Sequence, residues 1–214
     1  MEAKNINTTI YVAKVEELDD KDRQLVETSI EATNNSYAPY SRFHVGAAVR
    51  LDNGVIIPGC NQENAAFGVT ICAERTALFA AGAQYPKAKV EAIAITARNA
   101  DGLLDEPVSP CGTCRQAMVE TEKRSGKKLR ILLNGKNSVY IIEGIGALLP
   151  LTFSDEQLEA EIHLTVPAGK LMPQSILWMV LRLNDCCHRD PRVCSQRVGH
   201  CQWPWIWNRD GSHR

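Results

Sequence analysis

The chain has 214 residues, with 24 Lys and Arg against 25 Asp and Glu. This length predicts one domain, or one domain with an appendage, and the content of 44% hydrophobic and 23% charged residues excludes global disorder. Met1–Lys14 lacks the basic-then-apolar order of a secretory leader. The longest apolar run, Ile176–Leu181, is far shorter than the roughly 18 residues that cross a bilayer. We therefore expect a cytoplasmic protein without a membrane partner.

Residues 165–214 differ in composition from the rest of the chain. They contain all four Trp and four of the eight Cys, and their net charge is +4. Residues 1–164 contain 17 basic and 22 acidic side chains, which gives a net charge of −5. Residues 1–164 therefore lack the excess of basic side chains that binds a polyanion, so we expect no nucleic-acid partner.

The first half of the chain predicts a helix followed by a hairpin. Asp19 or Asp20 can cap a helix that continues to about Thr33. A strand is predicted over residues 45–51, and the turn 52–54, Asp-Asn-Gly, returns the chain into residues 55–57.

The second half alternates between helices and strands. An Ala-rich helix is predicted over residues 73–83, and the mostly apolar residues 90–96 are typical of a strand that is buried on both faces. After a polar loop at 99–108 we expect a helix at 113–124, strands at 129–133 and 138–142, and a short helix at 145–149. This order predicts an α/β fold in which helices flank a mixed five-stranded sheet.

Two cysteine groups carry the chemistry that the sequence predicts. Cys72 and the pair Cys111 and Cys114 each lie where a loop enters a predicted helix, and the partial positive charge of a helix N-terminus favours thiolates. Three thiolates suit Zn²⁺ and leave its fourth tetrahedral position to water, which a zinc ion activates near neutral pH. Glu74 follows Cys72 by two residues, so its carboxylate can approach that position without binding the metal and can carry protons.

Two other interpretations of these cysteines remain open. A Cys-x-x-Cys pair is also found in structural zinc sites and in redox proteins. A closed structural site needs a fourth ligand, for which Cys60 is the candidate, and Glu74 would then have no task. A redox pair would leave Cys72 without a role.

With these residues, the sequence over about residues 19–159 resembles the homotetrameric cytidine deaminases. Five segments carry the resemblance, and they stand in the family's order. The segments are residues 36–48 (Ser-Tyr-Ala-Pro-Tyr-Ser-Arg-Phe and Val-Gly-Ala-Ala), 59–65 (Gly-Cys-Asn-Gln-Glu-Asn-Ala), 72–77 (Cys-Ala-Glu-Arg-Thr-Ala), 109–116 (Ser-Pro-Cys-Gly-Thr-Cys-Arg-Gln) and 148–150 (Leu-Leu-Pro).

The resemblance implies a three-layer cytidine-deaminase-like fold, one Zn²⁺ per chain and a nucleoside substrate. Cys72, Cys111 and Cys114 would bind the zinc, Glu74 would transfer protons, and Arg75 would hydrogen-bond a ligand sulfur. The residues that the resemblance assigns to the substrate are Phe43 at the pyrimidine ring, Asn61 and Glu63 at the ribose hydroxyls, the backbone of Ala65 and Ala73, and Phe153 reaching the site of a neighbouring subunit. The implied activity is the hydrolytic deamination of cytidine and deoxycytidine to uridine and deoxyuridine in pyrimidine salvage.

Position alone allows a structural role for several of these residues. Phe43 precedes a predicted strand and could belong to the core, and Asn61 and Glu63 follow a strand, where capping and loop roles are usual. The alternatives for function are a blasticidin-type or other nucleoside deaminase, and a structural zinc protein that binds nucleic acid through its basic tail.

Residues 160–214 resemble no module, and we interpret them as a C-terminal extension of the 1–159 domain. A second metal site could be formed by Cys186, Cys187, His188, Cys194, His200 and Cys201, although their spacing fits no zinc module. The composition favours a non-native or poorly ordered extension.

Overall fold

A computed structural model describes residues 1–154 of the chain. These residues lie within Met1–Ala160, the first of the two units into which contacts divide the chain. The extension and its candidate second metal site lie outside the described residues. Within the described residues, no helix is both long enough and apolar enough to cross a membrane.

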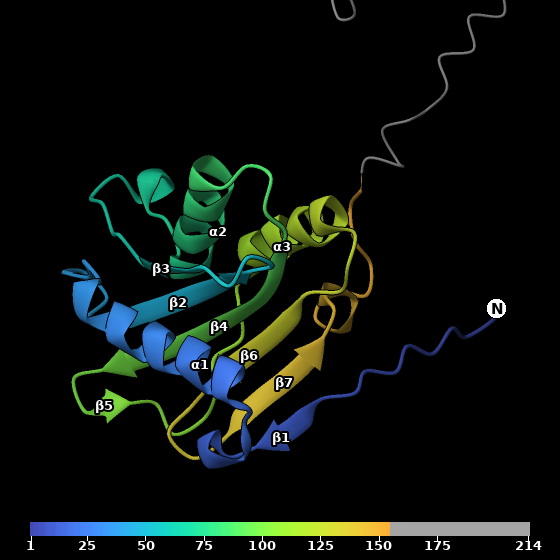
Figure 1. The fold of residues 1–214 in the computed structure, drawn as a ribbon, viewed down its shortest axis with the longest axis horizontal. Helices are drawn as coiled ribbons and strands as arrows, with labels where there is room; N and C mark the ends of the chain where they lie inside the picture. Colours follow the sequence, from blue (N-terminus) through green and yellow to red (C-terminus); the bar gives the residue numbers. More distant parts are fainter. Residues whose placement is uncertain (155–214) are drawn as a thin grey trace, which may run out of the picture. The chain divides into compact units, whose positions relative to one another are not determined.

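A mixed sheet forms the centre of the unit (Figure 1). Its strand order is β1-β7-β6-β4-β2-β3, with β5 pairing the end of β4, and only the β4–β6 pair is parallel. The strands are β1 (Tyr11–Ala13), β2 (His44–Leu51), β3 (Ile56–Cys60), β4 (Val90–Asn99), β5 (Gly102–Leu103), β6 (Arg130–Asn134) and β7 (Val139–Glu143).

The prediction of a mixed α/β sheet is confirmed, but the expected number of five strands is wrong. The two additional strands, β1 and β5, are too short to show a hydrophobic pattern. β1 pairs with β7 although about 130 residues separate them in the sequence. β5 falls in the segment that we expected to be a loop, and it turns back onto β4 at Gly102, whose positive φ of 115° suits glycine.

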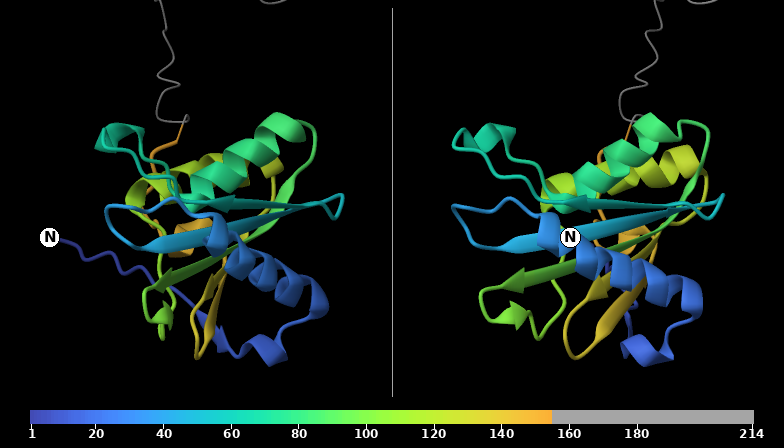
Figure 2. Two further views of the ribbon diagram at one scale, coloured as in Figure 1. Left: turned by 90° about the vertical axis from the view of Figure 1, so that its left-hand side faces the viewer. Right: turned by 60° about the vertical axis from the view of Figure 1, so that its left-hand side comes forward.

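Helices cover both faces of the sheet, which confirms the three-layer arrangement (Figure 2). Helix α1 (Asp20–Ala32) packs on one face, and α2 (Ala73–Gln84) and α3 (Gly112–Ser125) pack on the other. As predicted, Asp19 caps α1 by accepting a hydrogen bond from the backbone N–H of Asp22 at 2.8 Å. The short 3₁₀ helices are η1 (Val15–Glu17), η2 (Thr33–Asn35), η3 (Phe67–Val69) and η4 (Ile145–Ala147).

The central strand β4 contributes to the core on both sides, as its apolar sequence predicts. Ile93 and Ile95 face α2 and α3, whereas Ala92 and Ala94 face α1. Two glycines allow the helices to approach the sheet closely. A Cβ at Gly46 would lie 2.1 Å from the carbonyl oxygen of Ser29 in α1, and a Cβ at Gly59 would lie 2.5 Å from the backbone nitrogen of Ala77 in α2. Only glycine fits at either contact.

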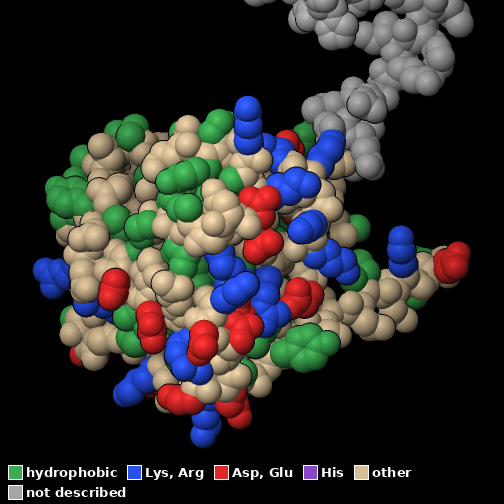
Figure 3. Space-filling model, in the orientation of Figure 1, with side chains coloured by type: hydrophobic (Ala, Val, Ile, Leu, Met, Phe, Trp, Pro, Cys, Tyr) green, Lys and Arg blue, Asp and Glu red, His purple; other side chains and the backbone are tan. Residues whose placement is uncertain are grey.

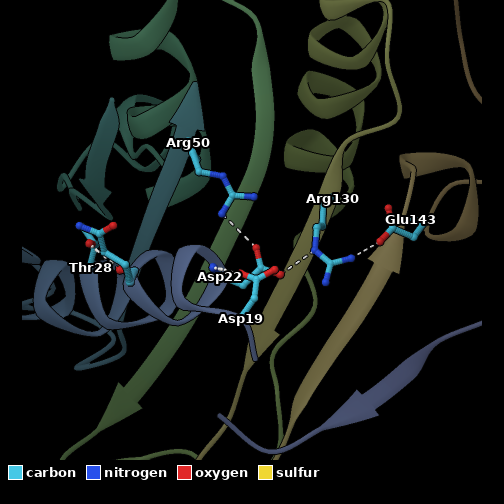
Figure 4. A network of polar contacts seen from close by, with 7 residues as sticks. Asp19, Asp22, Thr28, Arg50, Arg130 and Glu143 are labelled. Carbon is cyan, nitrogen blue, oxygen red and sulfur yellow. Dashed lines mark hydrogen bonds and ion pairs between the residues drawn. The ribbon is translucent and has the colours of Figure 1, made fainter. Parts of the chain in front are cut away.

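An ionic network fixes α1 to the sheet (Figure 4). The carboxylate of Asp22 is buried, with 1% of the residue exposed. Its Oδ1 lies 3.0 Å from Nη1 of Arg50 on β2, and its Oδ2 lies 2.7 Å from Nε of Arg130 on β6. Arg130 also pairs with Glu143 on β7. One carboxylate therefore holds two strands that are not neighbours in the sheet against the first turn of α1.

Replacing the charge at the centre of this network should destabilise the fold. Asp22→Asn keeps the shape of the side chain but leaves the largely buried Arg50 without a counter-charge and leaves Arg130 with Glu143 alone. We expect a loss of about 3 kcal/mol of unfolding free energy, measured by chemical denaturation. Glu143→Gln, at the exposed end of the network, is the matched control and should cost less than about 1 kcal/mol. Equal stability of Asp22→Asn and the wild type would contradict this account.

Candidate metal centre and nucleoside site

Three cysteine sulfurs meet where α2 and α3 begin. Cys72 is the N-cap of α2, Cys111 is the N-cap of α3, and Cys114 lies in the first turn of α3. The sulfurs of Cys72 and Cys111 are 3.9 Å apart, and all three lie within 4.8 Å of one another. Ligands in a tetrahedron with Zn–S bonds of 2.3 Å are separated by about 3.8 Å. In the part of the chain that the structure describes, this is the only cluster of three or more potential metal-ligating groups.

The local sequence explains why thiols gather here. Neither N-cap cysteine uses its side chain to cap its helix, so both sulfurs are free to face the cluster. Two helix N-termini contribute partial positive charge to the same place, which offsets the repulsion between thiolates. Cys60, the candidate fourth ligand, is not part of the group, and its sulfur instead contacts the carbonyl oxygen of Asn35 and the amide of Gln62, each at 3.2 Å.

The cluster favours deprotonation of one thiol and disfavours deprotonation of a second. Hydrogen bonding from Cys114 lowers the pKa of Cys72 to about 5, against the effect of burial, with further help from Arg75 and Cys111. The same hydrogen bond, together with burial and the charge of Glu74, raises the pKa of Cys114 far above its usual value. Full deprotonation therefore needs an added positive charge, which a divalent cation supplies. The donor set and its spacing fit zinc.

Two charged side chains of α2 lie beside the sulfurs. Nη2 of Arg75 lies 3.7 Å from the sulfur of Cys72, the kind of contact that the resemblance implies. Glu74 is buried in the first turn of α2, and burial, followed by the negative charge of Cys72, raises the pKa of its carboxyl group. A raised pKa brings a carboxyl group closer to the range in which a proton carrier is most effective.

Asn61 joins the end of β3 to the start of β2. Its Oδ1 accepts hydrogen bonds from the backbone N–H of Val45 at 2.8 Å and from the hydroxyl of Ser36 at 2.6 Å. Its Nδ2 donates to the carbonyl oxygen of Phe43 at 2.9 Å. These three bonds leave the amide one unused N–H.

Glu63 holds the loop that precedes β2. Its Oε2 accepts from the backbone N–H of Tyr40 at 2.9 Å and from that of Ser41 at 3.2 Å, and its Oε1 accepts from the hydroxyl of Ser41. The hydroxyl bond contributes most to lowering the pKa of Glu63. Between Ser41 and Phe43 the chain passes through Arg42 with a φ of 54°, a left-handed conformation that is unusual for a residue with a side chain.

Main-chain pairing brings this loop region next to the cysteine cluster. Gln62, between Asn61 and Glu63, exchanges backbone hydrogen bonds of 3.0 and 3.1 Å with Ile71, which directly precedes Cys72. The predicted metal and nucleoside residues therefore lie on adjoining segments. Phe43 is half-buried before β2, Ala65 is exposed before η3, and Ala73 is buried at the start of α2.

Phe153 connects to this region through its main chain. Its side chain is 56% exposed, and its carbonyl oxygen accepts a hydrogen bond of 2.8 Å from Nε2 of Gln116, two residues after Cys114. Sequence reasoning assigned no role to Ser36, Ser41, Arg115 or Gln116, although all four stand in the segments that carry the resemblance. The hydroxyls of Ser36 and Ser41 in a loop rich in turn residues were the only local sign of the bonds to Asn61 and Glu63.

Comparisons with known proteins agree with this arrangement. Residues 19–126 match the profile of the cytidine and deoxycytidylate deaminase zinc-binding region. The cytidine deaminase of Halalkalibacterium halodurans is 49% identical over 100 residues, which cover 46% of this chain and 71% of that protein. That of Sporosarcina psychrophila is 38% identical over 143 residues, which cover 63% and 93%.

Solved structures give the same result. The crystal structure of cytidine deaminase from Burkholderia pseudomallei is similar with a TM-score of 0.53 and 38% identity, covering 61% of this chain and 97% of that chain. The cytidine deaminase of Mycobacterium tuberculosis has a TM-score of 0.50 and 31% identity, with coverages of 64% and 99%. The chain therefore belongs to the zinc-binding cytidine and deoxycytidylate deaminases, a family of hydrolytic enzymes.

Proposed function

We propose that the protein hydrolyses free cytidine and deoxycytidine to uridine and deoxyuridine with release of ammonia. The observation that carries this proposal is the meeting of three cysteine sulfurs at two helix N-termini, with the buried carboxyl group of Glu74 in the same first turn. This donor set leaves one tetrahedral position open, as catalytic zinc sites do.

In this proposal Cys72, Cys111 and Cys114 hold one Zn²⁺ per chain, which supplies a Lewis acid that activates water at neutral pH. Glu74 accepts one proton from the water at its carboxylate and delivers it to N3 of the cytosine ring as the water oxygen bonds to C4. It then accepts the second proton, from the hydroxyl group now on C4, and delivers it to the amino nitrogen, so that the C4–N bond breaks and ammonia leaves. The raised pKa of Glu74 supports this role because the group must both accept and release a proton within one turnover. Arg75, through its contact with the sulfur of Cys72, offsets the negative charge of the thiolates.

Asn61 and Glu63 are proposed to bind the ribose hydroxyls. After its bonds within the protein, Asn61 keeps one N–H donor, and Oε1 of Glu63 keeps a lone pair beside its bond to Ser41. One donor and one acceptor match a hydroxyl group, which accepts one hydrogen bond and donates another. Phe43 is proposed to pack on the pyrimidine ring, and the backbones of Ala65 and Ala73 are proposed to contact the nucleoside.

The assembly proposed for this activity is a homotetramer in which Phe153 reaches the site of a neighbouring chain. Its exposed side chain supports such a role, as do the exposed Phe67, Val69 and Phe79. Hydrophobic side chains lie uncovered around η3 and α2 in the space-filling view (Figure 3). We also propose that the enzyme works in the cytoplasm, in pyrimidine salvage.

The zinc assignment makes a prediction about individual cysteines. Cys111→Ser removes a ligand from the cluster, so the purified variant should lose nearly all of the zinc that the wild type carries, as measured by atomic absorption. Cys60→Ser is the matched control and should keep its zinc, because its sulfur contacts Asn35 and Gln62 instead. Loss of zinc from Cys60→Ser together with its retention by Cys111→Ser would refute the assignment.

The proton-transfer role is tested together with the substrate. The wild type should convert cytidine and deoxycytidine to their uracil counterparts, followed by the change in ultraviolet absorbance. Glu74→Gln keeps the size of the side chain but carries no transferable proton, so turnover should fall by about 10²–10⁴-fold while zinc is retained. A zinc-loaded wild type that acts on neither nucleoside would contradict the proposed substrates, and an active Glu74→Gln would contradict the role of Glu74.

We further propose that residues 1–159 are the complete catalytic domain and that residues 160–214 are dispensable for the chemistry. A chain truncated after residue 160 should bind zinc, deaminate cytidine at the full-length rate and have the mass of a tetramer by analytical ultracentrifugation. A zinc-loaded truncated chain without activity would assign the extension a part in catalysis.

A further inference from the structure

Arg115 connects the residues around Cys111 and Cys114 to the segment that begins at Leu148. It follows Cys114 directly, and its half-buried side chain makes two hydrogen bonds to main-chain carbonyls. Nε donates to the carbonyl oxygen of Pro110 at 2.8 Å, and Nη1 donates to that of Leu148 at 2.9 Å. Pro110 is buried directly before Cys111, and Leu148 ends η4.

The two contacts use the shape of the guanidinium group. Its planar fork presents donors in different directions, so one side chain can hold two carbonyls that are far apart in the sequence. A lysine ammonium at the same position is a single point donor. Among residues 1–154 no carboxylate pairs with Arg115, and its side-chain hydrogen bonds go to two neutral carbonyl oxygens.

The neighbouring Gln116 makes a second connection to the same segment. Its Nε2 donates to the carbonyl oxygen of Phe153 at 2.8 Å. Two consecutive side chains of α3 therefore hold Leu148 and Phe153, near the two ends of the segment that follows η4. Only Arg115, however, also contacts the loop that carries Cys111.

The position of Cys111 depends on its main chain. The residue is exposed, and its side chain makes no capping bond. The carbonyl of Cys111 accepts from the backbone N–H of Arg115 at 2.9 Å, and the carbonyl of Pro110 accepts from the Arg115 side chain. One residue thus fixes two consecutive peptide groups around the exposed thiol.

We propose that Arg115 is a positioning residue of the metal site, which holds Cys111 at the correct distance from Cys114 and couples this pair to residues 148–153. This inference rests on the proposed zinc site. Side chains that support metal ligands indirectly typically change metal affinity by about 10–100-fold when they are removed.

The test is the rate at which the zinc-loaded, full-length protein releases zinc to an excess of a chromogenic chelator, without substrate. Arg115→Met keeps most of the aliphatic stem and removes both bonds, and it should release zinc about 10–100-fold faster than the wild type. Arg115→Lys can reach one carbonyl, so its rate should lie between the two. Arg124→Met removes the same charge from the other end of α3, and Gln116→Met breaks only the Phe153 contact, so both should release zinc at nearly the wild-type rate.

Release from Arg115→Met at the wild-type rate would overturn the proposal. Equal acceleration in Gln116→Met would also overturn it, because a general loosening of the 148–153 segment would then be the cause. If Arg115→Met does not fold, faster release from Arg115→Lys than from the wild type supports the proposal, and an unchanged rate overturns it. If Arg115→Met releases zinc faster but the wild type deaminates neither nucleoside, the positioning role is supported and the proposed substrates are refuted. If Arg115→Met releases zinc at the wild-type rate and the wild type is fully active, only the positioning role is refuted.

Discussion

The metal site requires three negatively charged thiolates to lie close together, and the arrangement of the site follows from that constraint. Thiolates repel one another, and the cluster makes the first easy to form and the next difficult, as the opposite pKa changes of Cys72 and Cys114 show. The fold lowers this cost by directing the N-termini of α2 and α3 to one place and by adding the guanidinium group of Arg75. The negative charge that is still uncompensated favours the binding of a dication over that of a neutral ligand.

The helices can meet there only because the sheet sets their positions. At Gly59 the absence of a side chain lets α2 lie against β3, and the chain then leaves β3 through Asn61 and Glu63 toward Cys72. On the opposite face, Asp22 ties α1 to β2 and β6 through two arginines. The sheet and its helices thus support the site, and most of the groups proposed to touch the substrate project from loops joined to them.

The sequence predicted those parts of the molecule whose signals are local. The cap at Asp19, the doubly buried β4 and the helix that begins after Cys111 all depend on neighbouring residues, and each is found as expected. β1 could not be predicted, because its three residues gain their structure from β7, far along the chain. At the site, the meeting of Cys72, Cys111 and Cys114 was predicted from residue type and spacing. The bonds of Asn61 and Glu63 were not, because several of their partners are backbone groups of Phe43, Val45, Tyr40 and Ser41, and backbone groups carry no signature in the sequence.

The binding of Glu63 to its own loop has a consequence for the rate at which ligands exchange. The carboxylate already accepts hydrogen bonds from the backbone of Tyr40 and Ser41 and from the Ser41 hydroxyl, and these bonds hold the loop without help from a ligand. If Glu63 binds a ribose hydroxyl as proposed, that hydroxyl can take the remaining lone pair of Oε1 without displacing the loop. Entry of a nucleoside and departure of its product would therefore proceed without an opening motion of this loop, which spares turnover a slow conformational step.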